Sequence, residues 1–490
     1  MKLLVARLFQ MTMVENESVF RRVIKSASAY IPQVPKPKKK ISLAEKFVWC
    51  GIALLAYLIM GQIPLYGVTS EPKFDFLAFA RVIFAAQQGT LMELGIGPIV
   101  TAGLLMQLLK GSDLIRLNFK NPDDRSLFTS ATKIVTIIVI IAEGSLYGAS
   151  VYGPLVNADG KHAWVTPILI TQLVSSSVIV MLLDEMVQKG WGLGSGISLF
   201  IMTGVAQSIM WSVLSPVPGS DGPVGIVPYM IDTAANGHFG DSFFRSGQLP
   251  SILGLMVTAG IILILVYLEG VHVDIPIVST KYRGFTAVYP IKLLYTSNIP
   301  VILASALLAN AVFMGHMRWA QYDVNNQNPI FNYLAQFDPS KPQTPTGGVL
   351  YYITSPASFE SASHDPLRTV VYIIFLTTVV TLFGRLWVEL GGLSAKSAAK
   401  NLLDADVQVP GFRRSEGSVE ALLGRYIPSV TIIGSVIIGL LASVSNVLNA
   451  FGSGTGILLM VSILVNYYTL LVREQVDTHM PQLAALLGRK

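Results

Sequence analysis

The sequence predicts an all-α protein that crosses a membrane many times. Hydrophobic residues make up 52% of the 490-residue chain, and charged residues only 13%. A soluble protein of this length needs more charge to cover its surface, whereas lipid-facing helices need very little. Apolar segments of roughly 17–25 residues, long enough to cross a bilayer as helices, recur along the whole chain. The expected fold class is therefore a polytopic membrane protein.

Ten segments have the length and composition of spanning helices. They are residues 43–63, 93–110, 132–153, 165–187, 195–214, 250–271, 299–317, 369–390, 427–448 and 454–473. Most of the 35 Lys and Arg residues fall in alternate connecting segments, beginning with the N-terminal one. Because basic residues collect on the cytosolic side of a membrane protein, this pattern predicts that both termini are cytosolic.

The composition also argues against several kinds of chemistry. The net charge of +6 is assigned to membrane orientation rather than to nucleic-acid binding. Cys50 is the single cysteine, which excludes internal disulfides. The six histidines lack metal-ligand spacing, and neither a phosphate-binding loop nor a catalytic triad is visible. We therefore expect no catalytic residues, no metal and no cofactor, and the chain is not expected to be an enzyme.

One connecting segment, residues 64–92, is apolar but is interrupted by Asp75 and Arg81 and cannot span the membrane. It leads into the second span, which carries three glycines and an interior Pro98. Two interpretations are open. The segment is either a re-entrant element packed inside the protein or an interfacial helix on the outer leaflet.

Two other connecting segments carry basic turns. Residues 272–298 alternate apolar and polar side chains around a Lys-Tyr-Arg-Gly turn, which is typical of a β-hairpin. Residues 391–426 contain the turn VPGFRRSEGS, which displays Arg413 and Arg414. Both turns fall on the predicted cytosolic side. The external segments, including 318–368, are uninformative.

Two spans share a stripe that changes from apolar to small or polar along the helix. At about 100° per residue, each stripe lies on one helix face. The stripes are Ile96, Val100, Gly103 and Gln107 in the second span, and Ile197, Ile201, Gly204 and Ser208 in the fifth. Two interpretations remain open: a hydrophobic constriction that resists water by dewetting, or ordinary packing of small residues between helices.

Glu143 lies in the middle of the third span, where a carboxylate costs about 2.5–3.5 kcal/mol on insertion scales. Thr101 and Asn310 are also mid-span and are available as hydrogen-bonding partners. Glu143 is therefore either a proton or cation relay or part of a polar clasp between helices. Few other ionisable groups lie at this depth, which favours the clasp.

The chain divides into two halves of five spans. The fifth span opens with GSGISLFI and the tenth with GTGILLMV, and an odd number of spans in each half implies inverted topology. We expect a cytosolic segment at 1–42, either a membrane-surface helix or a basic tail. The halves are expected at 43–248 and 249–473, and a cytosolic tail at 474–490.

Six stretches together resemble the archaeal branch of the SecY family, whose members are central subunits of protein-translocation channels. They are QIPLYG (62–67), LGIGPIVTAGLLMQLL (94–109), LLDEMVQKGWGLGSGISLFI (182–201), YPIKLLYTSNIPVILASALLAN (289–310), VPGFRRSE (409–416) and GTGILLMVSI (454–463). The resemblance extends over essentially all ten spans.

The resemblance implies a clamshell of two pseudo-symmetric inverted halves, with a pore closed by an apolar ring and a re-entrant plug helix. The implied ring residues are Ile96, Val100, Ile197, Ile201, Ile302 and Leu459. The plug is implied at about residues 65–92, with Phe74, Phe76, Phe79, Arg81 and Phe84 as members. The enlarged external segments 216–248 and 318–368 are departures from the family pattern.

The resemblance also implies a lateral gate to lipid, bridged by a polar cluster of Thr101, Glu143 and Asn310. The basic loops, with Lys281, Arg283, Arg413 and Arg414, are implied to dock ribosomes. The implied function is passive translocation of secretory polypeptides and sideways release of transmembrane segments, at the cell (plasma) membrane. Implied partners are SecE-type and small accessory (beta or SecG-type) subunits, the ribosome and its RNA, signal sequences and nascent chains. The alternative is an ion- or proton-coupled secondary transporter that uses Glu143.

Overall fold

The structure, a computed structural model, confirms the predicted helical membrane architecture. It describes residues 24, 26–27, 31–39, 41–68, 81, 84–111, 115, 121–152, 164–219, 222–243, 245, 249–279, 286–296, 299–323, 326–338, 341–356, 359–404, 407–411 and 415–479. Within these ranges nine helices are long and apolar enough to cross a membrane, and α4 is a shorter apolar helix. The ten helices are α2 (Leu43–Met60), α4 (Gly97–Gly111), α5 (Pro122–Tyr147), α7 (Val165–Met186), α8 (Gly196–Leu214), α10 (Ile252–Gly270), α11 (Ile299–Tyr322), α15 (Pro366–Leu390), α17 (Glu416–Val447) and α18 (Gly454–His479).

Each helix corresponds to one predicted span, but three of them begin four or more residues from the expected position. Helix α5 begins ten residues early, because the Asn121 side chain accepts the Asp123 N–H (3.1 Å) and Pro122 occupies the first helical position. Helix α17 begins at Glu416 and continues through Pro428. Helix α4 instead begins late, at Gly97, after a turn in which Gly95 has a positive φ of 53°. Hydropathy therefore locates the lipid-embedded part of a helix, whereas local capping locates its end.

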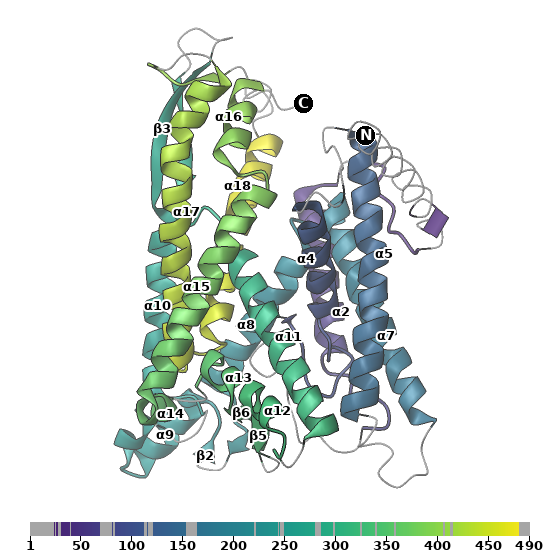
Figure 1. The fold of residues 1–490 in the computed structure, drawn as a ribbon, viewed down its shortest axis with the longest axis vertical. Helices are drawn as coiled ribbons and strands as arrows, with labels where there is room; N and C mark the ends of the chain where they lie inside the picture. Colours follow the sequence, from purple (N-terminus) through teal and green to yellow (C-terminus); the bar gives the residue numbers. More distant parts are fainter. Residues whose placement is uncertain are drawn as a thin grey trace, which may run out of the picture.

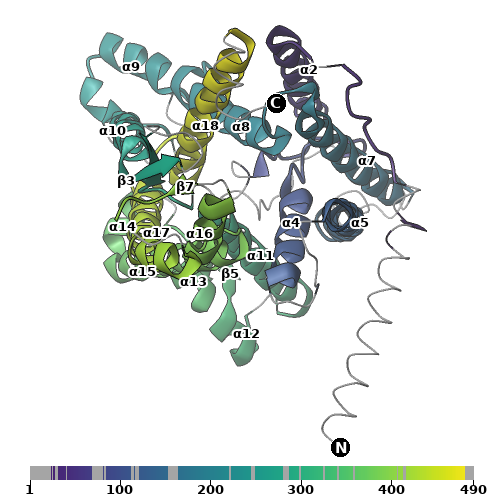
Figure 2. The same ribbon diagram turned by 90° about the horizontal axis from the view of Figure 1, so that it is seen from above.

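The helices form one bundle, and the chain enters its first span and leaves its last span on the same side. Seen from above, α2, α4, α5 and α7 lie on one side of the bundle and α10, α15 and α17 on the other, with α8, α11 and α18 between them (Figure 2). Lys46 at the start of α2 lies 2.5 Å from Glu474 near the end of α18. This ion pair connects the first of the ten helices to the last.

A small sheet caps one end of the bundle, which we call the hairpin side (Figure 1). Strands β3 (His272–Ser279) and β4 (Thr286–Lys292) pair antiparallel, which confirms the predicted hairpin. Strand β7 (Val407–Gln408) pairs with β3, and α16 (Ala395–Asp404) precedes it. For residues 391–426 the sequence predicted only a turn. Helix α16 and strand β7 in this segment are held by apolar contacts to β3 and α17, which hydropathy along the chain does not reveal.

The opposite end of the bundle carries short elements that the sequence left unassigned (Figure 1). They are β1 (Pro218–Gly219), β2 (Gly222–Pro223), α9 (Ile226–Ala235), η3 (Phe239–Ser242), α12 (Pro329–Leu334), β5 (Gln336–Asp338), β6 (Lys341–Gly347), α13 (Val349–Ile353) and α14 (Phe359–His364). Contacts distant in sequence hold them in place. The Arg245 guanidinium, for example, stacks 3.7 Å from the Tyr229 ring and donates to the Val224 carbonyl.

Two large hydrophobic clusters fill the bundle. One joins α2, α4, α7 and α8 to residues of α11 and α18, and we call it the central cluster. The other lies among α10, α11, α15, α17 and α18. Outside both, large apolar side chains are exposed, such as Leu263 at 72% and Ile138 at 59%. Because lipid solvates such side chains, they form the surface expected of a membrane protein.

Candidate functional site

All six predicted ring residues lie in the central cluster. Ile96, in the turn before α4, is fully buried, as are Ile201 of α8 and Leu459 of α18. The other three, Val100 of α4, Ile197 of α8 and Ile302 of α11, are partly buried against this core. The structure thus brings together aliphatic side chains from four helices that are far apart along the chain.

Asp184, near the end of α7, fixes the start of α8, the helix that supplies two of the predicted ring residues. Its Oδ1 accepts the Ile197 N–H (2.9 Å), which satisfies a backbone donor that the helix itself leaves unpaired. A Cβ on Gly196 would lie 2.6 Å from the Asp184 Cα, so the approach requires glycine. The Tyr467 hydroxyl of α18 lies 2.9 Å from the Ser195 carbonyl. Neighbours on two helices therefore set the position of Ile197.

The described end of the predicted plug rests on the central cluster. Phe84, Ala85 and Ala86 are buried in it. The Phe84 carbonyl accepts the Ile96 N–H (2.8 Å), and the Ala85 carbonyl accepts the Tyr57 hydroxyl (3.1 Å). This burial agrees with the re-entrant interpretation of the segment and excludes an interfacial helix for these residues. Three predicted plug residues, Phe74, Phe76 and Phe79, lie outside the described part of the chain.

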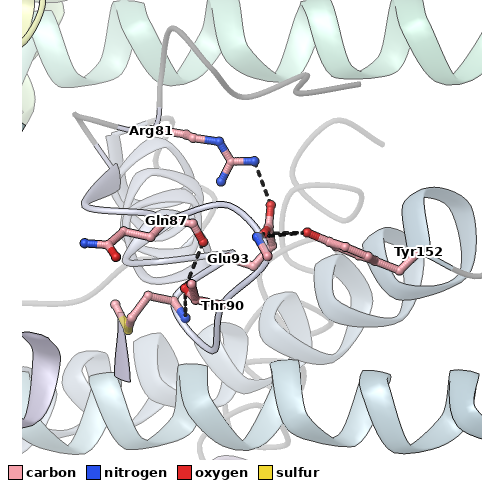
Figure 3. A network of polar contacts seen from close by, with 7 residues as sticks. Arg81, Gln87, Thr90, Glu93 and Tyr152 are labelled. Atoms are coloured by element: carbon pink, nitrogen blue, oxygen red, sulfur yellow. Dashed lines mark hydrogen bonds and ion pairs between the residues drawn. The ribbon is translucent and has the colours of Figure 1, made fainter. Parts of the chain in front are cut away.

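Arg81, the other plug residue, takes part in a buried ionic network (Figure 3). Its Nη2 lies 2.7 Å from Oε1 of Glu93, which is completely buried, and Arg81 itself is only 9% exposed. The second oxygen, Oε2, accepts the Tyr152 hydroxyl (2.7 Å) and the Gly89 N–H. Arg81 and Tyr152 approach Glu93 from opposite sides (Figure 3). One carboxylate thus ties the plug segment to the end of the third span.

Sequence reasoning missed Glu93 and Tyr152. In the sequence Glu93 is only the first residue of an apolar span, and Tyr152 is one of several aromatic residues. The sequence does contain one signal for the ion pair: Arg81 and Glu93 are oppositely charged residues in a largely apolar part of the chain. No pattern in the chain, however, pairs Tyr152 with a residue 59 positions away.

Two of the three predicted gate residues interact with each other in the structure. Thr101 of α4 and Glu143 of α5 share a side-chain hydrogen bond. Asn310 of α11 is exposed. One turn further along α11, the Phe313 ring stacks on Tyr147 of α5, with centroids 6.0 Å apart. Helix α11 also contacts α4, so this region is a seam between the first and second parts of the chain.

The four predicted basic docking residues, Lys281, Arg283, Arg413 and Arg414, lie outside the residues that the structure describes. The strands that precede these two segments are described, and they lie in one sheet, because Val278 of β3 pairs with Gln408 of β7.

No group of three His, Cys, Asp or Glu side chains suited to a metal ion occurs within the described ranges. Cys50 is buried and accepts the Leu193 N–H at its sulfur (3.2 Å).

Two family models match the chain. The SecY model matches residues 90–468, and the model described as the plug domain of Sec61p matches residues 55–89. Among curated proteins, the chain is 38% identical to the protein translocase subunit SecY of Pyrococcus furiosus over 479 residues. That match covers 96% of this chain and 99% of the relative.

Solved structures resemble the chain over most of its length. A structure described as that of a protein conducting channel has 36% sequence identity and a TM-score of 0.76, and the match covers 92% of this chain and 97% of the other. Sec61 from the canine ribosome-channel complex of the endoplasmic reticulum also has 36% identity, with a TM-score of 0.74 and the same coverage.

Proposed function

The chain belongs to the SecY family, and from that premise we propose which of its residues form the seal, the lateral gate and the docking sites of a protein-conducting channel. It is a translocation channel with a plug and not an enzyme. The observation that carries the proposal is the convergence of six aliphatic side chains in the central cluster, against which the plug end packs.

In the proposed mechanism these six side chains form the seal of the resting channel. Aliphatic groups hold no water or ions, so a narrow collar of them resists leakage by dewetting. They also make no specific hydrogen bonds, and a collar of this kind closes equally well around any polypeptide sequence. The plug, which rests on the ring through Phe84 and Ala85, completes the closed state.

The proposed lateral gate is the seam where α4 and α5 meet α11, between halves at 43–248 and 249–473. The Thr101–Glu143 hydrogen bond supports this assignment, and Asn310 is the proposed partner on the second half. Hydrogen bonds between membrane helices average near 0.6 kcal/mol and rarely exceed about 2 kcal/mol. A small polar cluster therefore holds the gate closed reversibly, and a hydrophobic transmembrane segment passes sideways into lipid when it opens.

The proposed location is the cell (plasma) membrane, with both termini and the hairpin side in the cytosol. One neighbour, the canine Sec61, was solved in a ribosome-channel complex. On that likeness Lys281, Arg283, Arg413 and Arg414 are the proposed ribosome-docking residues, because Lys and Arg bind RNA phosphates. The proposed further partners are a SecE-type subunit, a small accessory subunit, signal sequences and nascent chains.

A proton-coupled transporter, the alternative that Glu143 raised, is not favoured by the family match. The hydrogen bond from Thr101 supports the clasp interpretation of this carboxyl group instead.

The ring assignment is tested with a variant in which Ile96, Val100, Ile197 and Ile201 are all serine. In a planar bilayer the resting variant is expected to conduct ions, because hydroxyl groups stabilise water in the constriction. The matched control also introduces four serines, at positions that are exposed on the outer surface of the spans: Ile138, Leu263, Val266 and Ile374. The assignment is wrong if the ring variant stays as tight as the unmodified channel.

A further inference from the structure

The geometry points to a continuous chain of contacts that couples plug seating to closure of the lateral seam. It runs from Arg81 to Glu93, Tyr152, Tyr147 and Phe313, and we call it the plug–seam chain. It makes Glu93, Tyr152, Tyr147 and Phe313 positioning residues for gating. The inference rests on the proposed plug and gate assignments.

The first link is the buried ion pair. Glu93 is 0% exposed and divides its two oxygens between Arg81 of the plug and the Tyr152 hydroxyl. Displacement of the plug removes Arg81 and leaves a buried carboxylate without its cation, which is strongly unfavourable. Glu93 must then be rehydrated or shift. Either response disturbs Tyr152, whose hydroxyl is one of the remaining donors to Glu93.

The second link is the fixed donor role of Tyr152. A tyrosine hydroxyl keeps its proton at neutral pH, and an ionised carboxylate can only accept hydrogen bonds. The Tyr152 hydroxyl therefore donates to Glu93. The Gly89 N–H donates to the same hydroxyl oxygen (3.1 Å), so the plug end, Glu93 and Tyr152 form one closed network.

The third link is a π-helical turn, η1 (Gly148–Tyr152), that continues α5. Such a turn closes hydrogen bonds between residues five apart, and it brings the rings of Tyr147 and Tyr152 to a centroid distance of 6.1 Å. Both rings are buried in one cluster with Leu94, Leu169 and Leu173. In that packed surrounding, a shift of Tyr152 cannot occur without a response from Tyr147.

The last link crosses the seam. Phe313 of α11 stacks on Tyr147, with an interplanar angle of 20°, and packs against the same cluster. When α11 moves away, Tyr147 loses the ring that covers it. The coupling is reciprocal by linkage: an open seam loosens the plug by the same free energy by which a displaced plug loosens the seam.

The test measures plug seating while the seam is altered. Cys50 is the single cysteine, so Cys50→Ser gives a thiol-free full-length channel into which Ala86→Cys is placed at a buried position of the plug end. The readout is the rate at which a charged methanethiosulfonate reagent labels this cysteine in native membrane vesicles. Phe313→Ala is expected to raise the rate about fivefold or more, the lower range of typical coupling between sites.

A double-mutant cycle decides whether the effect travels through the plug–seam chain. In an Arg81→Gln background, Phe313→Ala is expected to add nothing to the labelling rate. Tyr152→Phe, which keeps the ring and removes the donor, serves as the background if Arg81→Gln does not assemble. Phe375→Ala, a truncation in the other large cluster, is the control and is expected to label as slowly as the parent.

An unchanged rate in Phe313→Ala, or an equal increase in both backgrounds, overturns the inference. These outcomes differ from failure of the proposed function. If Ala86→Cys is labelled rapidly in the otherwise unmodified channel, the plug is not seated on the ring, and the sealing proposal itself is wrong.

Discussion

At the residue scale, the contact between plug and ring depends on one glycine. Gly95 has a φ of 53°, in the left-handed region that favours glycine. A Cβ there would lie 2.1 Å from the Phe84 carbonyl oxygen, which accepts the Ile96 N–H. Backbone strain and steric overlap would therefore act at the same point, next to the proposed ring residue Ile96.

We predict that Gly95→Ala displaces the plug end and opens an ion leak. Positive φ alone costs about 1–3 kcal/mol for a residue with a side chain, and the overlap with Phe84 adds to it. Gly237→Ala is the matched control, since Gly237 has a φ of 77° but its Cβ would meet nothing within 4 Å, and it lies between α9 and η3, away from the plug. Planar-bilayer conductance is expected to rise for Gly95→Ala well above that of Gly237→Ala. Equal conductance in Gly95→Ala and Gly237→Ala would show that the close approach of Gly95 to Phe84 is unimportant.

Residue chemistry in the site was only partly predictable. The stripe of Ile96 and Val100 follows from helical spacing, but its proposed role in a pore ring rests on family resemblance. The ion pair between Arg81 and Glu93 and the cap that Asp184 provides to α8 depend on how the chain folds back on itself. Periodicity records which face of a helix a residue occupies, not which distant side chain it meets.

At the element scale, hydropathy located all ten spans, and strand alternation located the β3–β4 hairpin. The extra helical turns at the start of α5 lay outside the apolar run and were therefore missed. Strand β7 is two residues long and pairs with β3, from which the six helices α11 to α16 separate it along the chain. Short elements of this kind have no periodic signal of their own.

The hairpin-side loops lead to a prediction about ribosome binding. Reversing Arg283 and Arg413 to Glu is expected to weaken binding, and to flatten its salt dependence by about 0.7–0.9 in log–log slope for each phosphate that is no longer neutralised. The measurement is a binding titration against ribosomes at several salt concentrations. Lys396→Glu with Lys400→Glu, on neighbouring α16, controls for a general change of charge. Unchanged binding and slope would remove the two loops from the docking surface.

At the scale of the whole molecule, the central cluster connects the two parts of the chain. Residues of α4 and α8 pack there against residues of α11 and α18. Opening at the proposed lateral gate would separate this cluster, so the proposed seal and the proposed gate belong to one rearrangement. Aliphatic contacts suit that role, because they separate without leaving buried polar groups unpaired.

Glu143→Gln distinguishes a gate clasp from a proton site. Glutamine retains an oxygen that accepts a hydrogen bond from Thr101 but carries no exchangeable charge. We therefore expect translocation in reconstituted vesicles to persist, with a changed requirement for signal-sequence hydrophobicity. Glu143→Ala, which removes the bond, is expected to change that requirement further. Proton-coupled uptake of a solute that disappears in Glu143→Gln would contradict the clasp.

The most direct test of the account is site-specific crosslinking to a stalled nascent chain. A photoreactive residue at Ile201, which is buried in the central cluster, is expected to crosslink to a secretory polypeptide arrested midway through the channel. The same probe at Ile138, which is 59% exposed on the outer face of α5, is expected to label lipid instead. Strong crosslinking from Ile138 with none from Ile201 would contradict the claim that polypeptides pass through the aliphatic ring.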